Sequence, residues 1–428
     1  MAKALLTKLW FRVLLGLLLG IAFGFLVGPM SADTLGIDGK TLLTTYIKPI
    51  GTIFINLIKM VIVPLIFFSL VSGIISMTNA EAFKRIGLKA VGAYLMTGAF
   101  AVCIGLAFAH FFHPGVGVDL TSLASVVGGA AHAVTPPKDV SVIDILVNTI
   151  PPNVIKAMAE DNILQVVVFA IFVGVTLNKL GNKVQNLTDF CKSAAFLVFR
   201  MIETIVRFSP YGVFALTAWM VGTQGIDILL ALFKLVCVVI SALLVQYLLF
   251  GLMIMVFGRM SPLPFYRKML EPQLLAFSTS SSKATLSTAM RVVNERIGVS
   301  KSSTAFVLPL GASINMDGTA IYLGITALFF SQAYGIPLDA HHYFILILTA
   351  TLGSIGAAGI PSGSLFMMGM VFTSVGLPLD GIALIAGIDR ILDMMRTTVN
   401  ITGDSVITML VDKSEGTFDK ALYQDMER

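Results

Sequence analysis

Residues 340–378 read AHHYFILILTATLGSIGAAGIPSGSLFMMGMVFTSVGLP, and none of them is Asp, Glu, Lys or Arg. The run is long enough to cross a bilayer, but Gly353, Gly356, Gly359, Pro361 and Gly363 interrupt its centre. Neither end carries a basic cluster, which favours the outer side of a membrane for both ends. We therefore predict a re-entrant hairpin that enters the membrane from outside.

A second interrupted run occupies residues 262–298. It is apolar, contains the stretch STSSS at 278–282, and has basic residues at both ends, so we predict a hairpin that enters from the cytoplasm. Between the hairpins, the run 302–333 is interrupted by GASINMDG at 311–318, and the run 380–412 follows the second hairpin. Hairpin–helix pairs that enter from opposite faces form an inverted repeat, and matching broken segments mark the binding site of secondary transporters.

The composition places the whole chain in a membrane. Charged residues make up 12% of the 428 and hydrophobic residues 56%, with a mean hydropathy of +0.90, whereas soluble domains carry about 25% charged residues. Six further spans are predicted at 9–29, 41–77, 86–113, 162–180, 193–221 and 227–258, with an external loop containing short helices at 114–160. Lys and Arg cluster in alternate loops, which places both termini in the cytoplasm. This distribution argues against a nucleic-acid partner despite the formal charge of +5.

The last predicted helix carries charged side chains on one face. In residues 387–404, GIDRILDMMRTTVNITGD, a turn of 100° per residue puts six polar residues within an arc of about 100°: Asp389, Asp393, Arg396, Thr397, Asn400 and Asp404. Each ionised residue at a bilayer centre costs roughly 2.5–3.5 kcal/mol, so this face must meet partners, water or ligands. One interpretation is an Asp393–Arg396 ion pair that only holds helices together. A binding site also explains Asn400, Asp404 and Asp317.

The residue types indicate what such a site would bind. The planar guanidinium of Arg396 suits a carboxylate, and Asp393, one turn away, suits an ammonium group. A second carboxylate of the ligand is left for the free N–H groups at a hairpin tip. These features favour glutamate or aspartate. Hard cations prefer oxygen ligands, which Asn315, Asp317, Asn400 and Asp404 supply. His, Cys and Glu are missing from this cluster, which argues against a transition-metal site.

These motifs resemble those of the dicarboxylate/amino acid:cation symporter family, which includes the glutamate and aspartate transporters. The matching strings are TSSS at 279–282, NMDGTAIY at 315–322, GIPSG at 359–363 and DRILDMMRTTVNITGD at 389–404, and the resemblance covers nearly the whole chain. It implies an all-α integral membrane protein with eight transmembrane helices and two re-entrant helical hairpins in inverted repeats. It further implies a homotrimer in which a transport domain slides against a scaffold, as an elevator.

The same resemblance implies positions for the substrate and for sodium ions. The substrate would contact Ser280, Ser281, Ser282, Thr319, Ile360, Pro361, Ser362, Gly363, Ser364, Asp393, Arg396, Thr397 and Asn400. One sodium ion would bind carbonyls of Gly311, Asn315 and Asn400 with the carboxylate of Asp404; a second would bind the backbone of Ser313, Met316, Ser354, Ile355 and Ala357; a third would bind Tyr94, Thr97, Asn315 and Asp317. Gly98 stands where many members have a hydroxyl, which weakens the third site. Lys283 either compensates for an arginine that is usual in the first hairpin or points to the cytoplasm.

We therefore predict a secondary active symporter, not an enzyme, in the inner membrane of a bacterium. It takes up glutamate or aspartate with sodium, protons being the alternative coupling ion, and needs no organic cofactor. The expected scaffold comprises 1–85 and 114–221, the transport domain 86–113, 222–258 and 259–412, and a cytoplasmic tail 413–428. The main alternative is a C4-dicarboxylate symporter, against which Asp393 argues because it would repel a substrate without an amine. A passive anion channel and a membrane hydrolase are alternatives of other classes.

Overall fold

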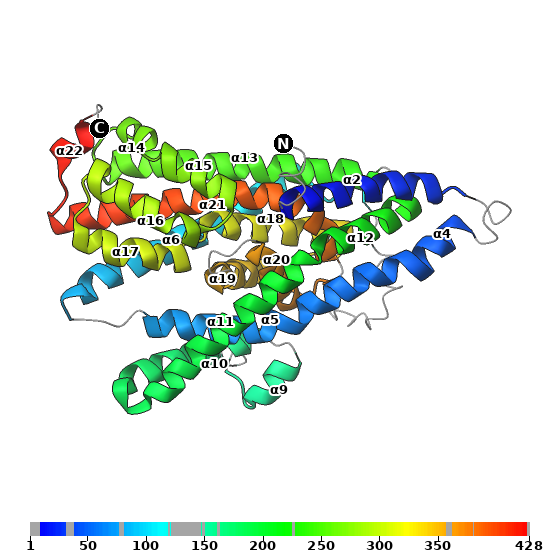
Figure 1. The fold of residues 1–428 in the computed structure, drawn as a ribbon, viewed down its shortest axis with the longest axis horizontal. Coiled ribbons are helices and arrows are strands. Elements are labelled where there is room, and N and C mark those ends of the chain that lie inside the picture. Colours follow the sequence, from blue (N-terminus) through cyan, green and yellow to red (C-terminus); the bar gives the residue numbers. More distant parts are fainter. Residues whose placement is uncertain are drawn as a thin grey trace.

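The computed structural model describes residues 9–30, 38–76, 81–118, 120, 147, 150–160, 163–224, 227–356, 362–379 and 381–425. Every regular element within these ranges is a helix, which confirms the all-α prediction (Figure 1). The elements are α2 (Leu9–Val27), α4 (Gly39–Leu42), η1 (Leu43–Ile47), α5 (Lys48–Ser76), α6 (Glu81–Phe112), α9 (Val154–Ala159), α10 (Ile163–Leu180), η2 (Gly181–Val184), α11 (Gln185–Arg207), α12 (Ser209–Gln224), α13 (Asp227–Val256), α14 (Leu263–Lys268), α15 (Leu270–Thr279), α16 (Ser282–Val292), η3 (Val293–Ile297), α17 (Lys301–Ile314), α18 (Asp317–Ala333), α19 (Ala340–Gly356), α20 (Gly363–Ser374), α21 (Gly381–Glu415) and α22 (Lys420–Gln424).

Several of these helices have the length and composition of membrane spans. In the described ranges, four helical stretches are long and apolar enough to cross a bilayer: Gly39–Ser72, Arg85–Phe112, Gln165–Ile202 and Leu229–Val256. Phe11–Val27 and Gly363–Ser374 are shorter apolar helices. The chain is accordingly a multi-pass membrane protein, and the number of eight crossings stays a prediction.

The predicted span 193–221 is wrong, because two helices share this stretch. Helix α11 ends at Arg207, and α12 begins at Ser209. Pro210 lacks a backbone N–H, so it cannot continue the hydrogen-bond ladder of α11. The N–H groups of Tyr211 and Gly212 instead donate to the carbonyl of Phe208, at 3.1 and 3.2 Å.

The predicted interruptions in the C-terminal third are confirmed where the structure describes them. Helices α15 and α16 pack together as the first hairpin, and Ser280 between them has a left-handed backbone with φ of 52°. Residues 315 and 316 separate α17 from α18. Helices α19 and α20 also pack together, as the second hairpin, and residues 357–361 between them lie outside the described ranges.

Helix α21 extends from the end of the molecule that carries α22 toward its middle, among α13, α15, α17 and α18 (Figure 1). Helices α13, α15, α17 and α18 pack directly on α21, and α6 packs on α18. A second group forms around α5, on which α10, α11 and α12 pack. Helix α2 lies close against α12: a Cβ atom added at Gly16 or Gly24 would come within 2.5 Å of a backbone oxygen of α12. Small residues therefore let these two backbones approach.

The C-terminal segment packs against the base of the first hairpin. The ammonium group of Lys268 donates to the carbonyls of Leu422 and Arg296, at 2.7 and 2.8 Å. The N–H of Asp419 donates to the carbonyl of Gly298 at 2.9 Å, and the hydroxyl of Tyr423 donates to the backbone carbonyl of Ser261 at 2.7 Å. Helix α22 is thus held at the same end of the molecule as α14 (Figure 1).

Candidate functional site

The polar face of α21 lies inside the protein. Asp389, Arg396 and Asp404 have no exposed surface, and Asp393, the most exposed of the six predicted polar residues, retains only 6%. Thr397 and Asn400 are also buried, with 4% and 3% of their surface exposed. These charges therefore meet protein groups, as their cost in an apolar environment requires.

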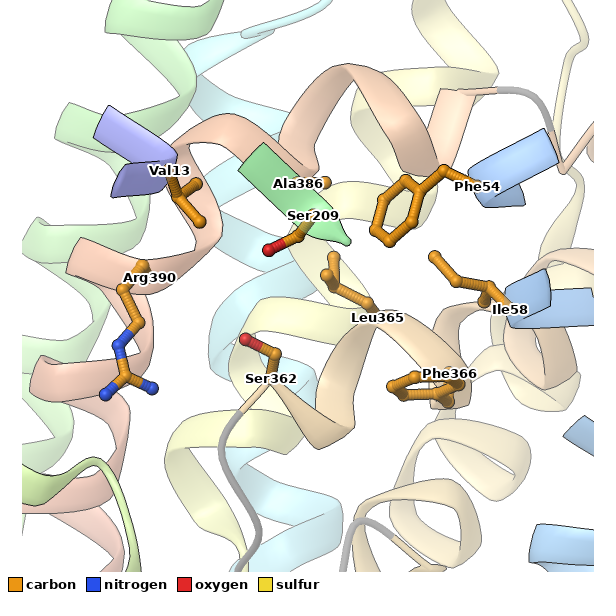
Figure 2. Close-up of a pocket in the computed structure, with 9 residues that line it drawn as sticks. All are labelled: Val13, Phe54, Ile58, Ser209, Ser362, Leu365, Phe366, Ala386 and Arg390. Atoms are coloured by element: carbon orange, nitrogen blue, oxygen red, sulfur yellow. The ribbon is translucent and has the colours of Figure 1, made fainter. Parts of the chain in front are cut away.

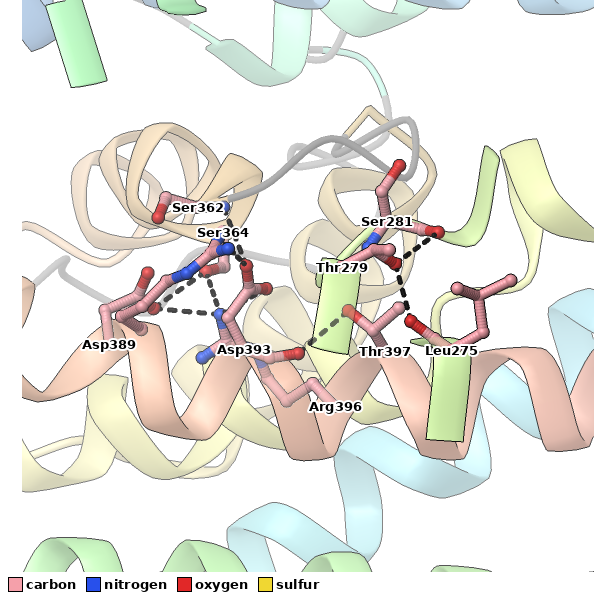
Figure 3. A network of polar contacts seen from close by, with 10 residues as sticks. Leu275, Thr279, Ser281, Ser362, Ser364, Asp389, Asp393, Arg396 and Thr397 are labelled. Atoms are coloured by element: carbon pink, nitrogen blue, oxygen red, sulfur yellow. Dashed lines mark hydrogen bonds and ion pairs between the residues drawn. The ribbon is translucent and has the colours of Figure 1, made fainter. Parts of the chain in front are cut away.

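Arg396 connects α21 to the beginning of α20. Its Nη2 atom donates to Asp389 Oδ1 at 2.8 Å, to Asp393 Oδ1 at 3.0 Å and to Ser364 Oγ at 2.7 Å (Figure 3). Its guanidinium carbon lies 4.0 Å from the centre of the Tyr322 ring, a cation–π contact. The Nε and Nη1 atoms are buried without a hydrogen-bond partner. The guanidinium thus keeps donors available for a carboxylate.

Asp393 joins the same network from the other side. Its Oδ2 atom accepts from the backbone N–H of Ser362 at 2.9 Å, and its Oδ1 atom accepts from Arg396. Ser362 has a left-handed backbone with φ of 58° and is the residue just before α20. The Asp393–Arg396 ion pair of the alternative interpretation is therefore present. It extends to the tip of the second hairpin, however, and leaves buried polar atoms unpaired on Arg396 and on Asp389.

The tip of the first hairpin lies over the same side of α21 (Figure 3). Ser281 is the N-cap of α16, and its Oγ atom accepts from the N–H of Ala284 at 3.3 Å. The Oγ atoms of Ser280 and Ser282 are buried without a hydrogen-bond partner. An unpaired buried hydroxyl costs free energy, so these two serines are suited to bind a ligand.

Asn400 fixes the start of α18 against α21. Its Oδ1 atom accepts from the N–H of Gly318 at 2.7 Å, and its Nδ2 atom donates to the sulfur of Met316 at 3.3 Å. A Cβ atom at position 318 would come within 2.7 Å of the carbonyl oxygen of Arg396, so only glycine fits there. Thr319, the next residue, is buried.

Asp404 lies beside the end of α17. Its Oδ1 atom accepts from Asn315 Nδ2 at 2.9 Å, and its Oδ2 atom is buried without a partner. A Cβ atom added at Gly311 would approach Asp404 Oδ1 to 2.9 Å and the hydroxyl of Tyr94 to 2.7 Å. The structure therefore brings Gly311, Asn315 and Asp404, assigned to the first sodium ion, close to Tyr94, which was assigned to the third; sodium binding by these residues stays a prediction.

Asp317 forms a second buried carboxylate at the break. Its Oδ2 atom accepts from Gln246 Nε2 at 3.3 Å, and its Oδ1 atom has no partner. Thr97 Oγ1 donates to Asn315 Oδ1 at 3.2 Å. A Cβ atom at Gly98 would lie 3.8 Å from Asp317 Oδ1. A hydroxyl at position 98 would thus reach this carboxylate, and glycine leaves that position without a ligand.

The remaining predicted residues are placed only in part. Met316 lies in the break before α18, and Ser313 belongs to α17, which packs on α19. Ser354 and Ile355 lie in the last turn of α19, where carbonyl groups lack partners within their helix. Gly363 begins α20. Ala357, Ile360 and Pro361 lie outside the described residues.

The structure adds Arg390, which the sequence analysis did not single out, and decides the position of Lys283. Arg390 Nη1 lies 3.7 Å from Asp393 Oδ2. Its position next to Asp389, within the same buried helix, was the available signal. Lys283 Nζ lies over the ring of Phe199 of α11, 4.9 Å from the ring centre. Lys283 therefore contacts α11.

Charged side chains buried at the centre of an apolar helical bundle, beneath broken helices, define a secondary transporter. The chain matches the model of the sodium:dicarboxylate symporter family over residues 9–414. It belongs to this family, whose members are transporters and not enzymes. The resemblance that the sequence motifs indicated is confirmed.

Curated relatives match the chain over nearly its full length. It is 32% identical to the proton/sodium-glutamate symport protein of Bacillus subtilis, over 96% of this chain and 93% of the relative. It is 33% identical to the proton/glutamate-aspartate symporter of Escherichia coli, over 98% and 96%. A C4-dicarboxylate transport protein of Pseudomonas syringae pv. tomato is 34% identical, over 96% and 87%.

Proposed function

We propose that this protein is a secondary active symporter that takes up glutamate or aspartate together with sodium ions. The observation that carries this function is the buried pairing of Asp393 with Arg396 at the tip of the second hairpin. An acidic amino acid brings one ammonium and two carboxylates, so it can exchange these protein ion pairs for pairs with itself. Such an exchange leaves neither buried charge without a partner, which would otherwise be costly.

The coupling to cations is supported by two other carboxylates. Asp317 and Asp404 are completely buried, each has one unpaired oxygen, and neither forms an ion pair with a basic residue in the described part of the chain. Two monovalent cations bound to them would balance two negative charges. Cations bound to Asp317 and Asp404 would also increase the affinity for the substrate. The substrate would increase the affinity for the cations by the same factor, because coupling is reciprocal.

The larger arrangement that we propose follows the family resemblance. The group around α5, with α2, would act as the scaffold, and α6 with α13 to α21 would carry the substrate in an elevator motion. Eight crossings, both termini in the cytoplasm of a bacterium, and a homotrimer complete this proposal. The second hairpin packs on α5 through α20, so the two groups of helices meet there.

A C4-dicarboxylate symporter is the second candidate, because relatives with that name match the chain equally well. The balance of charge favours an amino acid instead. Asp393 would lie beside a substrate that carries two negative charges and no amine, and like charges in a buried site repel.

Uptake into proteoliposomes distinguishes these functions. We expect an inward sodium gradient to drive accumulation of labelled glutamate or aspartate above the external concentration, with the unlabelled form of either competing better than succinate. A proton gradient without sodium tests the alternative coupling ion. Accumulation of succinate alone would refute the amino-acid assignment, and uptake that only equilibrates the label would indicate a channel.

A further inference from the structure

Arg390 occupies a position that the proposed function does not yet explain. Its side chain, 14% exposed, lines a narrow cavity between α21 and residues of α2, α5 and α12, among them Val13, Phe54 and Ser209 (Figure 2). Ser362, at the tip of the second hairpin, lines the same cavity. The cavity therefore runs from the charged network to the neighbouring helices.

The guanidinium of Arg390 is incompletely paired. Its Nε and Nη1 atoms are buried without a hydrogen-bond partner. The distance of 3.7 Å from Nη1 to Asp393 Oδ2 is an ion pair, but it is too long for a hydrogen bond. Burying a cation without hydrogen bonds is costly, so an arginine whose function was only to pack would be a poor choice here.

The formal charges around Asp393 are balanced only when Arg390 is counted. The network holds two carboxylates, Asp389 and Asp393, and two guanidinium groups, Arg390 and Arg396. Arg396 contacts Asp393 Oδ1, and Arg390 lies nearest to Asp393 Oδ2. Without Arg390, the other three residues would carry one net negative charge.

We propose that Arg390 is a specificity-determining residue, which supplies a cation to Asp393 Oδ2 until the amine of the substrate replaces it. This inference rests on the proposed function and names the residue that sets the preference between acidic amino acids and diacids without an amine. The positive charge of Arg390 competes with an ammonium group for Asp393, and it attracts an additional carboxylate. Removing this charge should favour the amino acid and disfavour succinate.

The test compares how glutamate and succinate compete with labelled substrate in proteoliposomes. For Arg390→Gln, we expect the ratio of the succinate inhibition constant to the glutamate constant to rise about tenfold, as for the loss of a close buried charge. Arg390→Lys keeps the charge and should stay within about twofold of the parent ratio. Arg390→Met, which preserves the apolar stem, carries the comparison if the Gln variant is not recovered folded.

The outcomes separate this inference from the proposed function. A folded, neutral variant with an unchanged ratio, or one in which both constants change by the same factor, would overturn the role of Arg390. An equal change of the ratio in Arg390→Lys would also contradict it, since the charge would then not be the cause. If the parent protein binds no acidic amino acid, the proposed function itself fails.

Discussion

Asp404→Asn separates sodium binding from substrate recognition, because it removes one charge without changing the shape of the side chain. The carboxylate has no exposed surface, and only its Oδ1 atom is hydrogen-bonded, to Asn315 Nδ2 at 2.9 Å. An amide that keeps this bond must turn its NH2 group to the position of Oδ2. The N–H donors of this amide then lie at the position where a cation needs an oxygen ligand.

The magnitude follows from the charge that is lost. A sodium ion within about 4 Å of a carboxylate gains about 4 kcal/mol at an effective dielectric constant of about 20. Because the amide keeps one oxygen, we expect about half of this to be lost, which is about 2 kcal/mol or about 30-fold in sodium affinity. The order of preference among glutamate, aspartate and succinate should remain that of the parent.

The assay is uptake at increasing sodium concentration, at a fixed concentration of labelled substrate. Asp412→Asn is the matched control: Asp412 is also completely buried on α21, but it accepts from the N–H and hydroxyl of Ser300, at 3.0 and 2.6 Å. This control should lower thermal stability and leave half-maximal sodium unchanged. An unaltered sodium titration in Asp404→Asn, or the same shift in both variants, would refute the reasoning.

Three further changes test other parts of the site. Arg396→Cys should weaken binding of acidic amino acids at least about 30-fold, because it removes one partner of buried ion pairs; unchanged competition by glutamate would contradict its role. Gly98→Ser should lower the sodium concentration for half-maximal uptake about threefold or more by adding an oxygen near Asp317, whereas Gly98→Ala, with the same Cβ atom, should not. Hydrogen bonds from Lys89 and then from Arg85 lower the pKa of Glu415 below 4.5, so its stabilisation is complete above that pH and is lost as the pH falls. The difference in melting temperature between the parent and Glu415→Gln should therefore shrink as the pH falls below 4.5. A difference that increases as the pH falls would contradict this sign.

Interruptions of apolar runs made much of the architecture predictable. Serines at 280 and 281 and the Asn315–Met316 pair stand where the helices break, since these residues supply caps or tolerate non-helical backbone. The inside position of the polar face of α21 followed from its charges alone. Averaged hydropathy over 193–221 does not register the break at Phe208, although Arg200, Glu203 and Arg207 before it and Pro210 after it were available signals.

The pairing within the site could not be predicted. Periodicity places Asp389, Asp393 and Arg396 on one face, but it does not say that Asp389 makes the shorter contact with Arg396. Arg390 was overlooked because it lies 100° from Asp389 around the helix, outside the stripe of polar residues. Its long side chain reaches back to Asp393, and reach of this kind depends on the rotamer.

The contacts of Lys268 also constrain how the protein is made. Its acceptor carbonyl at Leu422 lies 154 residues later in the chain. During synthesis the first hairpin therefore emerges and inserts long before the helix that completes its base exists. Until translation reaches α22, the ammonium group of Lys268 can use the carbonyl of Arg296 but not that of Leu422, and a chain that ends within α21 would lack the second contact.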